Sequence, residues 1–177
     1  SLDALGNAFL RSGKVDSAKI IYDNVIIISD TLTAFLPYKQ NALNALGIIN
    51  YRNGNYKDAI SQFIQLHEIS SASGNLKASA SYSGNIAGLF FSLKNYERAM
   101  FYYQKTLEYY SSLGQKLYVA LTHENIGLVQ KETGLFDSAL VRFGLAEKTY
   151  VEFKNFSQLA NLYQNMSSTY IPAKLFI

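Results

Sequence analysis

One eight-residue segment recurs along the chain at a fixed spacing of 40 residues. Each copy contains an aromatic residue followed three positions later by alanine, and the three copies span residues 53–60, 93–100 and 133–140. An earlier copy, residues 12–19, lies 41 positions before the first. A period of roughly 20 to 50 residues indicates one supersecondary unit repeated along an array. The chain therefore folds by stacking copies of a single unit.

Two further columns extend each copy on both sides. Upstream, a small residue recurs with an apolar residue directly before it, in the order Gly6, Gly47, Ala87, Gly127 and Ser167. Downstream, an aromatic residue recurs as Tyr22, Phe63, Tyr103 and Phe143. Small residues at these spacings suit two antiparallel helices that cross closely and are joined by a tight turn. Each copy is therefore predicted to be a helix pair.

The register divides the chain into four full units and the first helix of a fifth. The predicted boundaries are 1–32, 33–74, 75–114, 115–154 and a truncated unit at 155–177. The β-branched run from Ile20 to Ile28 would suit a strand by itself, but the same columns are helical in later units. Because one unit cannot bury its apolar face alone, neighbours stack into a solenoid. We expect nine helices in a single all-α array without a sheet.

These columns resemble the tetratricopeptide repeat family over nearly the whole chain. Residues 44–63 carry the family's Leu-Gly, Gly, Tyr, Ala and aromatic positions in order. The family's usual period is about 34 residues, so the longer period here is similar to that of kinesin light chains, polarity adaptors and bacterial peptide-responsive regulators and sensor kinases. The resemblance implies a right-handed superhelix of antiparallel helix pairs that binds protein or peptide segments in its groove.

The resemblance also implies which residues line that groove. In the family, the first helix of each pair contributes positions two, three and six before the small column and one after it. Here these positions are rich in amides and nearly uncharged, and they predict a peptide groove at Asn41, Asn44, Ser81, Asn85, Gly88, Leu121, Glu124, Asn125, Leu128, Asn161, Gln164 and Asn165. Asparagine offers both a donor and an acceptor to an extended peptide backbone. The alternative is that these amides only cap or solvate the helices.

Several functional classes find no support in the sequence. His123-Glu124 is half of a zinc-protease HExxH motif, but Gly127 stands where the second histidine should be. The chain has no cysteine, and its 16 basic residues are scattered without a run, which argues against nucleic acid. No apolar stretch approaches the roughly 20 residues of a membrane span. We predict no catalytic, cofactor or metal site, and no membrane insertion.

The sequence thus predicts a soluble binding scaffold and not an enzyme, with a protein or an extended peptide as partner. By analogy with the family, it would be the sensory or interaction portion of a larger bacterial signalling protein, in the cytoplasm or periplasm. The alternative is a structural adaptor that self-assembles, for instance as a homodimer, through its open end or its convex face.

Overall fold

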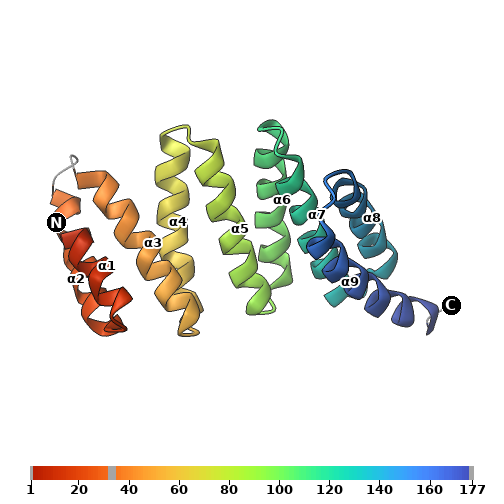
Figure 1. The fold of residues 1–177 in the computed structure, drawn as a ribbon, viewed down its shortest axis with the longest axis horizontal. Coiled ribbons are helices and arrows are strands. Elements are labelled where there is room, and N and C mark those ends of the chain that lie inside the picture. The colour runs from red at the N-terminus through yellow and green to blue at the C-terminus, as the bar shows by residue number, and fades with distance from the viewer. Residues whose placement is uncertain (1, 32–34, 176–177) are drawn as a thin grey trace. The chain divides into compact units, whose positions relative to one another are not determined.

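All regular structure in the described residues, 2–31 and 35–175 of the computed structural model, is helical. The helices are α1 (Leu2–Arg11), α2 (Val15–Thr31), α3 (Leu36–Arg52), α4 (Tyr56–Ala72), α5 (Leu76–Ser92), α6 (Tyr96–Ser112), α7 (Lys116–Glu132), α8 (Phe136–Glu152) and α9 (Phe156–Leu175). Figure 1 shows their order. The all-α prediction is confirmed, and α2 includes the β-branched run at 20–28.

The 40-residue period follows from the lengths of these elements. Helices α3 to α8 each have 17 residues, and three-residue turns join them. In each turn one residue has a positive φ, which glycine adopts at the least cost, as at Gly54, Gly74, Gly114 and Gly134. Lys94 and Lys154 take the same conformation with φ of 56° and 53°. The repeated geometry therefore holds even where a lysine replaces the glycine.

The chain forms two compact units, residues 1–73 and 74–177. In unit 1, α1 contacts α2 and α3, and α3 contacts both α2 and α4. In unit 2, consecutive helices from α5 to α9 contact one another, and α7 also contacts α9. Within each unit, then, helix pairs stack in chain order, as the solenoid prediction requires.

The small column and the aromatic column meet inside the helix pairs. A Cβ atom added to Gly6 would lie 2.8 Å from the ring of Tyr22, and one added to Gly47 would lie 2.9 Å from the ring of Phe63. At Gly127 the distance to Phe143 would be 2.6 Å. The ring of the second helix therefore occupies the space that a side chain on the first helix would need. This contact explains why the first helix carries a glycine at these three positions.

Candidate functional site

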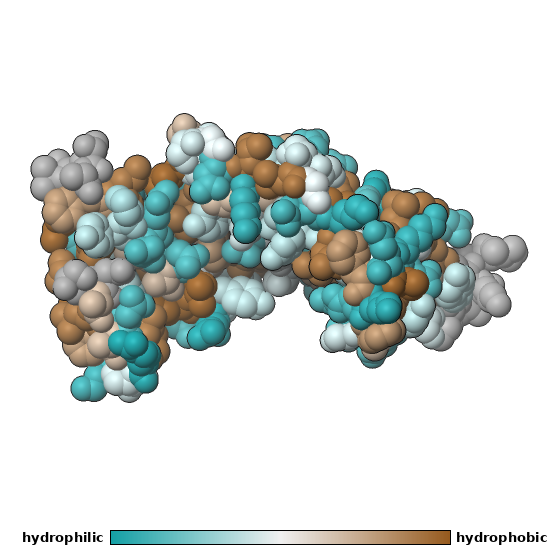
Figure 2. Space-filling view, turned by 45° about the horizontal axis from the view of Figure 1, so that its top comes forward, coloured by the Kyte–Doolittle hydropathy of each residue, from teal (hydrophilic) through white to brown (hydrophobic). Residues whose placement is uncertain are grey.

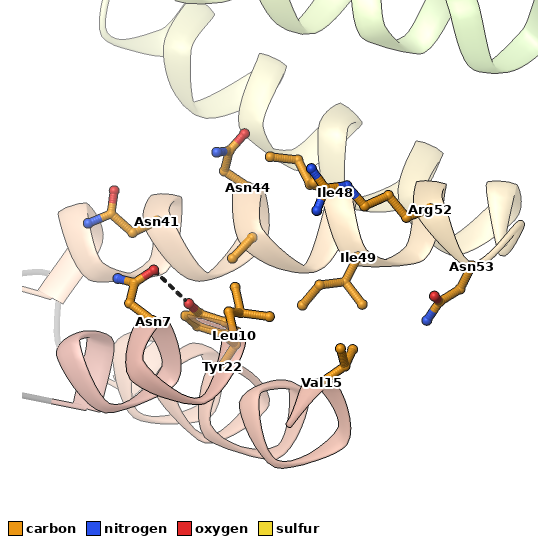
Figure 3. A pocket seen from close by; sticks show the side chains of 11 residues that line it. Asn7, Leu10, Val15, Tyr22, Asn41, Asn44, Ile48, Ile49, Arg52 and Asn53 are labelled. Atoms are coloured by element: carbon orange, nitrogen blue, oxygen red, sulfur yellow. Dashed lines mark hydrogen bonds between the residues drawn. The ribbon is translucent and has the colours of Figure 1, made fainter. Parts of the chain in front are cut away.

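Unit 1 has a pocket of about 490 Å³ formed by α1, α2 and α3. Two residues of the predicted groove, Asn41 and Asn44, lie in its wall. Figure 3 shows the side chains that line it, which are Asn7, Leu10, Val15, Tyr22, Asn41, Asn44, Ala45, Ile48, Ile49, Arg52 and Asn53. The structure thus brings the predicted groove residues of α3 together with residues of α1 and α2.

The floor of the pocket is apolar and continuous with the core of unit 1. Leu10 and Val15 pack against a buried cluster that includes Tyr22 and Ile49. The hydroxyl of Tyr22 donates to Oδ1 of Asn7 over 3.0 Å, as the dashed line in Figure 3 shows. Nδ2 of Asn7 remains as a donor for a ligand.

Arg52 is the charged residue of this pocket. It stands in the last turn of α3, and its side chain extends back along the helix toward Ile48 (Figure 3). The eleven lining residues include no aspartate or glutamate. The pocket therefore combines an apolar floor, an amide wall and one guanidinium without a carboxylate opposite it.

The predicted set did not include several of these lining residues. Asn7 and Ile48 occupy the register position one after the small column, the same position that selected Gly88 and Leu128. The register could therefore have found both. Arg52 lies one helical turn beyond Ile48, outside the register positions, and only the folded structure associates it with the pocket.

In unit 2 the predicted groove residues lie on α5, α7 and α9. On α5, Ser81 and Asn85 are exposed and Gly88 is half-buried, and Ser81 is hydrogen-bonded to Tyr110. On α9, Asn161 and Gln164 are exposed. These five residues lie on accessible surface or at its edge.

The predicted groove residues of α7 are more buried than those of α5 and α9. Leu121 is exposed and Asn125 is half-buried, but Leu128 packs against the core cluster that contains Phe143. Glu124 is only 5% exposed. One repeat position can thus be solvent-exposed in one helix and buried in the core in another.

Glu124 is held by two hydrogen bonds from neighbouring helices. The hydroxyl of Tyr150 on α8 donates to its Oε2 over 3.0 Å, and Nδ2 of Asn165 on α9 donates to its Oε1 over 3.1 Å. Burial raises the pKa of Glu124, and the two hydrogen bonds partly oppose that rise. Because Nδ2 of Asn165 donates to Glu124, Oδ1 of Asn165 remains as an acceptor. Glu124 and Asn165 are therefore coupled, and not two independent ligand contacts.

His123 is engaged by a cation. Its Nδ1 lies 3.2 Å from Nη1 of Arg142, and burial together with the Arg142 charge lowers the pKa of His123. A neutral ring can accept the guanidinium hydrogen at Nδ1. Among residues 2–31 and 35–175, no group of three or more His, Cys, Asp or Glu side chains could hold a metal ion. Nor is any helix in those ranges long and apolar enough to cross a membrane.

Comparisons with known proteins agree with this architecture. Residues 38–112 match the family model described as tetratricopeptide repeat, while no curated protein matches the sequence. The first of the similar solved structures is BtubC (BKLC) from P. vanneervenii, at 21% identity and a TM-score of 0.79, covering 98% of this chain and 72% of that one. Residues 38–112 therefore match tetratricopeptide repeats, and the similar structure shares the helical-repeat fold of the chain.

Two further structures share the fold. A signal transduction ATPase with a tetratricopeptide repeat sensor from Pyrococcus horikoshii has 15% identity and a TM-score of 0.85. The match covers 96% of this chain and 26% of the ATPase. YrrB, described as a tetratricopeptide repeat protein with an unusual peptide-binding site, has 15% identity and a TM-score of 0.65. The match covers 98% of this chain and 76% of YrrB.

Proposed function

We propose that the chain is a binding scaffold that holds an extended peptide or protein segment against the first helices of its repeats. The observation that carries this proposal is the unit 1 pocket, where amides from two first helices, Asn7, Asn41 and Asn44, stand over an apolar floor. Small-ligand sites are typically such concave apolar surfaces with a few placed polar groups. The peptide-binding site named for YrrB supports the same use of this fold.

The amides suit the repeating polar groups of a peptide backbone. An extended chain advances about 3.3 Å per residue, and neighbouring packed helices lie roughly 8–10 Å apart. One amide per helix could therefore meet the backbone about every third residue. Since most of the predicted positions are uncharged, the backbone part of the binding should depend only weakly on salt.

A displayed library of random decapeptides tests this function. The immobilised wild-type chain should enrich a set of peptides, and the double variant N7A/N44A should bind that set more weakly. Each lost neutral hydrogen bond should cost about 0.5–1.5 kcal/mol. Asn24, an exposed residue of α2 outside the pocket lining, provides the matched control N24A. Enrichment of no peptide by the wild-type chain would contradict the function itself.

The role in signalling is a further part of this proposal. The similar ATPase carries its tetratricopeptide repeats as a sensor, and this chain corresponds to about a quarter of that protein. We infer that the present chain serves as the sensory or interaction portion of a bacterial signalling protein. The sequence of the complete open reading frame would test this, because we expect it to encode an attached kinase, ATPase or DNA-binding domain.

A second candidate function, self-assembly, has its own observation. Figure 2 shows apolar residues on the surface at the N-terminal end of unit 1, and on α2 Ile20 and Ile27 are 62% and 65% exposed. At the register position of Ile27 the later second helices carry charges, namely Glu68, Glu108 and Lys148. An adaptor that dimerises through α2 should show a concentration-dependent mass in sedimentation, and I27E should abolish it. A mass that stays monomeric at all concentrations excludes this candidate.

A further inference from the structure

We propose that the unit 1 pocket selects partner segments in which an aliphatic side chain stands next to an acidic one. The aliphatic side chain would rest on the floor made by Leu10, Val15 and Ile49, and the carboxylate would meet the guanidinium of Arg52. This specificity rests on the proposed peptide-binding function, and it adds the chemical class of the ligand.

Arg52 favours a ligand that brings acceptors, because a guanidinium has donors only. Nδ2 of Asn7, whose Oδ1 accepts from Tyr22, adds a further donor to the pocket. The lining holds no carboxylate to neutralise Arg52. A lysine or arginine of a partner would therefore be repelled there, whereas a carboxylate would gain a charge-assisted hydrogen bond.

The apolar floor favours an aliphatic neighbour for that carboxylate. Leu10 and Val15 are partly buried against the core of unit 1, and Ile48 is 40% exposed in the same pocket. A volume of about 490 Å³ lies within the roughly 300–1,000 Å³ of small-ligand sites. The space therefore suits part of a segment, such as one side chain with its flanking backbone, and not a whole domain.

Stabilisation of the helix end does not by itself explain why an arginine stands at position 52. A cation in the last turn stabilises a helix through its dipole, and Arg11 does the same in α1 at the equivalent register position. The equivalent residue of α5, however, is Ser92, and the last turn of α5 contains no basic residue. A first helix of this repeat can thus end without a cation, so the dipole does not require Arg52. Arg11 is outside the pocket lining and is therefore a matched control.

The experiment uses three pools of acetylated and amidated decapeptides, which carry no terminal charges. All positions are random except a central pair, which is leucine–glutamate, leucine–glutamine or alanine–glutamate. The wild-type chain should bind the first pool about fivefold more than the second, since an ion pair with an exposed arginine such as Arg52 is worth up to about that factor. It should bind the first pool about tenfold more than the third, since a buried aliphatic side chain is worth at least that factor. The R52Q variant should lose about fivefold on the first pool and bind the first two pools equally, while R11Q should match the wild type.

The outcomes separate this specificity from the general function. An unchanged preference for the leucine–glutamate pool in R52Q, or an equal loss in R11Q, would overturn the specificity. Peptides enriched from the random library without any acidic–aliphatic pair would also overturn it while leaving the binding function intact. If no pool and no random peptide binds the wild-type chain, both the function and the specificity are wrong.

Discussion

The hydroxyl of Tyr150 donates to the buried carboxylate of Glu124 over 3.0 Å, and this bond joins α8 to α7 inside unit 2. Tyr150 is itself fully buried. Burial, and then the charge and hydrogen bond of Glu124, raise the pKa of Tyr150, so its hydroxyl stays protonated and remains the donor. Glu124 thus links α7 to α8 at a register position where α3 and α9 carry the amides of Asn44 and Gln164.

Removing that hydroxyl should destabilise unit 2. Y150F leaves Oε2 of Glu124 buried without its donor, and losing a hydrogen bond to a charged group should lower the free energy of unfolding by about 1–3 kcal/mol. Urea unfolding followed by circular dichroism measures the change. Y170F, at an exposed tyrosine of α9, should unfold like the wild type. Equal midpoints for Y150F and Y170F would show that the Glu124 bond contributes nothing.

The raised pKa of Glu124 makes a signed prediction for pH. The folded chain holds the Glu124 proton more tightly than the unfolded chain, whose glutamates titrate near pH ~4.3. Between that pH and the higher folded pKa, unfolding releases a proton, so the free energy of unfolding falls as pH rises. It levels off above the folded pKa.

The variant E124Q isolates this effect, because glutamine cannot ionise. We expect the stability of the wild type relative to E124Q to be greatest at acidic pH and to decline as pH rises toward neutrality. Denaturant titrations of both proteins at a series of pH values give the difference. A difference that stays constant across the series would mean that the carboxylate titrates alike in the folded and unfolded chains.

The three asparagines at the position two before the small column should not respond alike. Asn85 is exposed and Asn125 half-buried, and N85A and N125A should leave the fold intact while weakening any peptide contact made there. N165A removes a donor from Glu124 and should cost about 1–3 kcal/mol of stability. Thermal unfolding of the three single variants distinguishes them. Equal stabilities would mean that the Asn165 bond carries no energetic weight.

Glycine in the first helix should be required where the partner ring needs its space. G127A would place a Cβ 2.6 Å from Phe143, and this overpacking should cost about 1–3 kcal/mol. The matched control is G144A on α8, where an added Cβ meets nothing within 4 Å. Because alanine has the higher helix propensity, G144A should stabilise by up to about 1 kcal/mol. Two changes of the same sign would contradict the ring-on-glycine packing.

The repeat register explains how much of the fold was predictable. It overruled the β-branched signal of residues 20–28, because columns shared by four copies outweigh the weak preference of one segment, and α2 is helical there. Left-handed glycines recur in the turns of the repeat at Gly54, Gly74, Gly114 and Gly134. The same conformation at Lys94 and Lys154 follows from the stacked helices around each turn and has no signal in the lysines themselves.

The candidate site was less predictable, because it depends on contacts between distant residues. The position of Glu124 corresponds to Asn44, Gly84 and Gln164 in other repeats, and nothing in that column indicates that one member is buried. Its partners lie 26 and 41 residues away. Arg52 suits the end of any helix, so its place in a pocket emerges only once α1 packs beside α3. Sequence columns identify the face of a helix, but packing decides which members remain accessible.

The central claim is that a partner segment binds the first helices through the unit 1 pocket. The most direct measurement is the mapping of amide chemical-shift changes when a library-selected decapeptide is titrated into the labelled chain. We predict that the largest changes cluster at the pocket residues of α1 and α3, including Asn7, Asn44 and Arg52. Changes confined to the exposed face of α2 around Ile20 and Ile27, with the pocket unaffected, would contradict the claim.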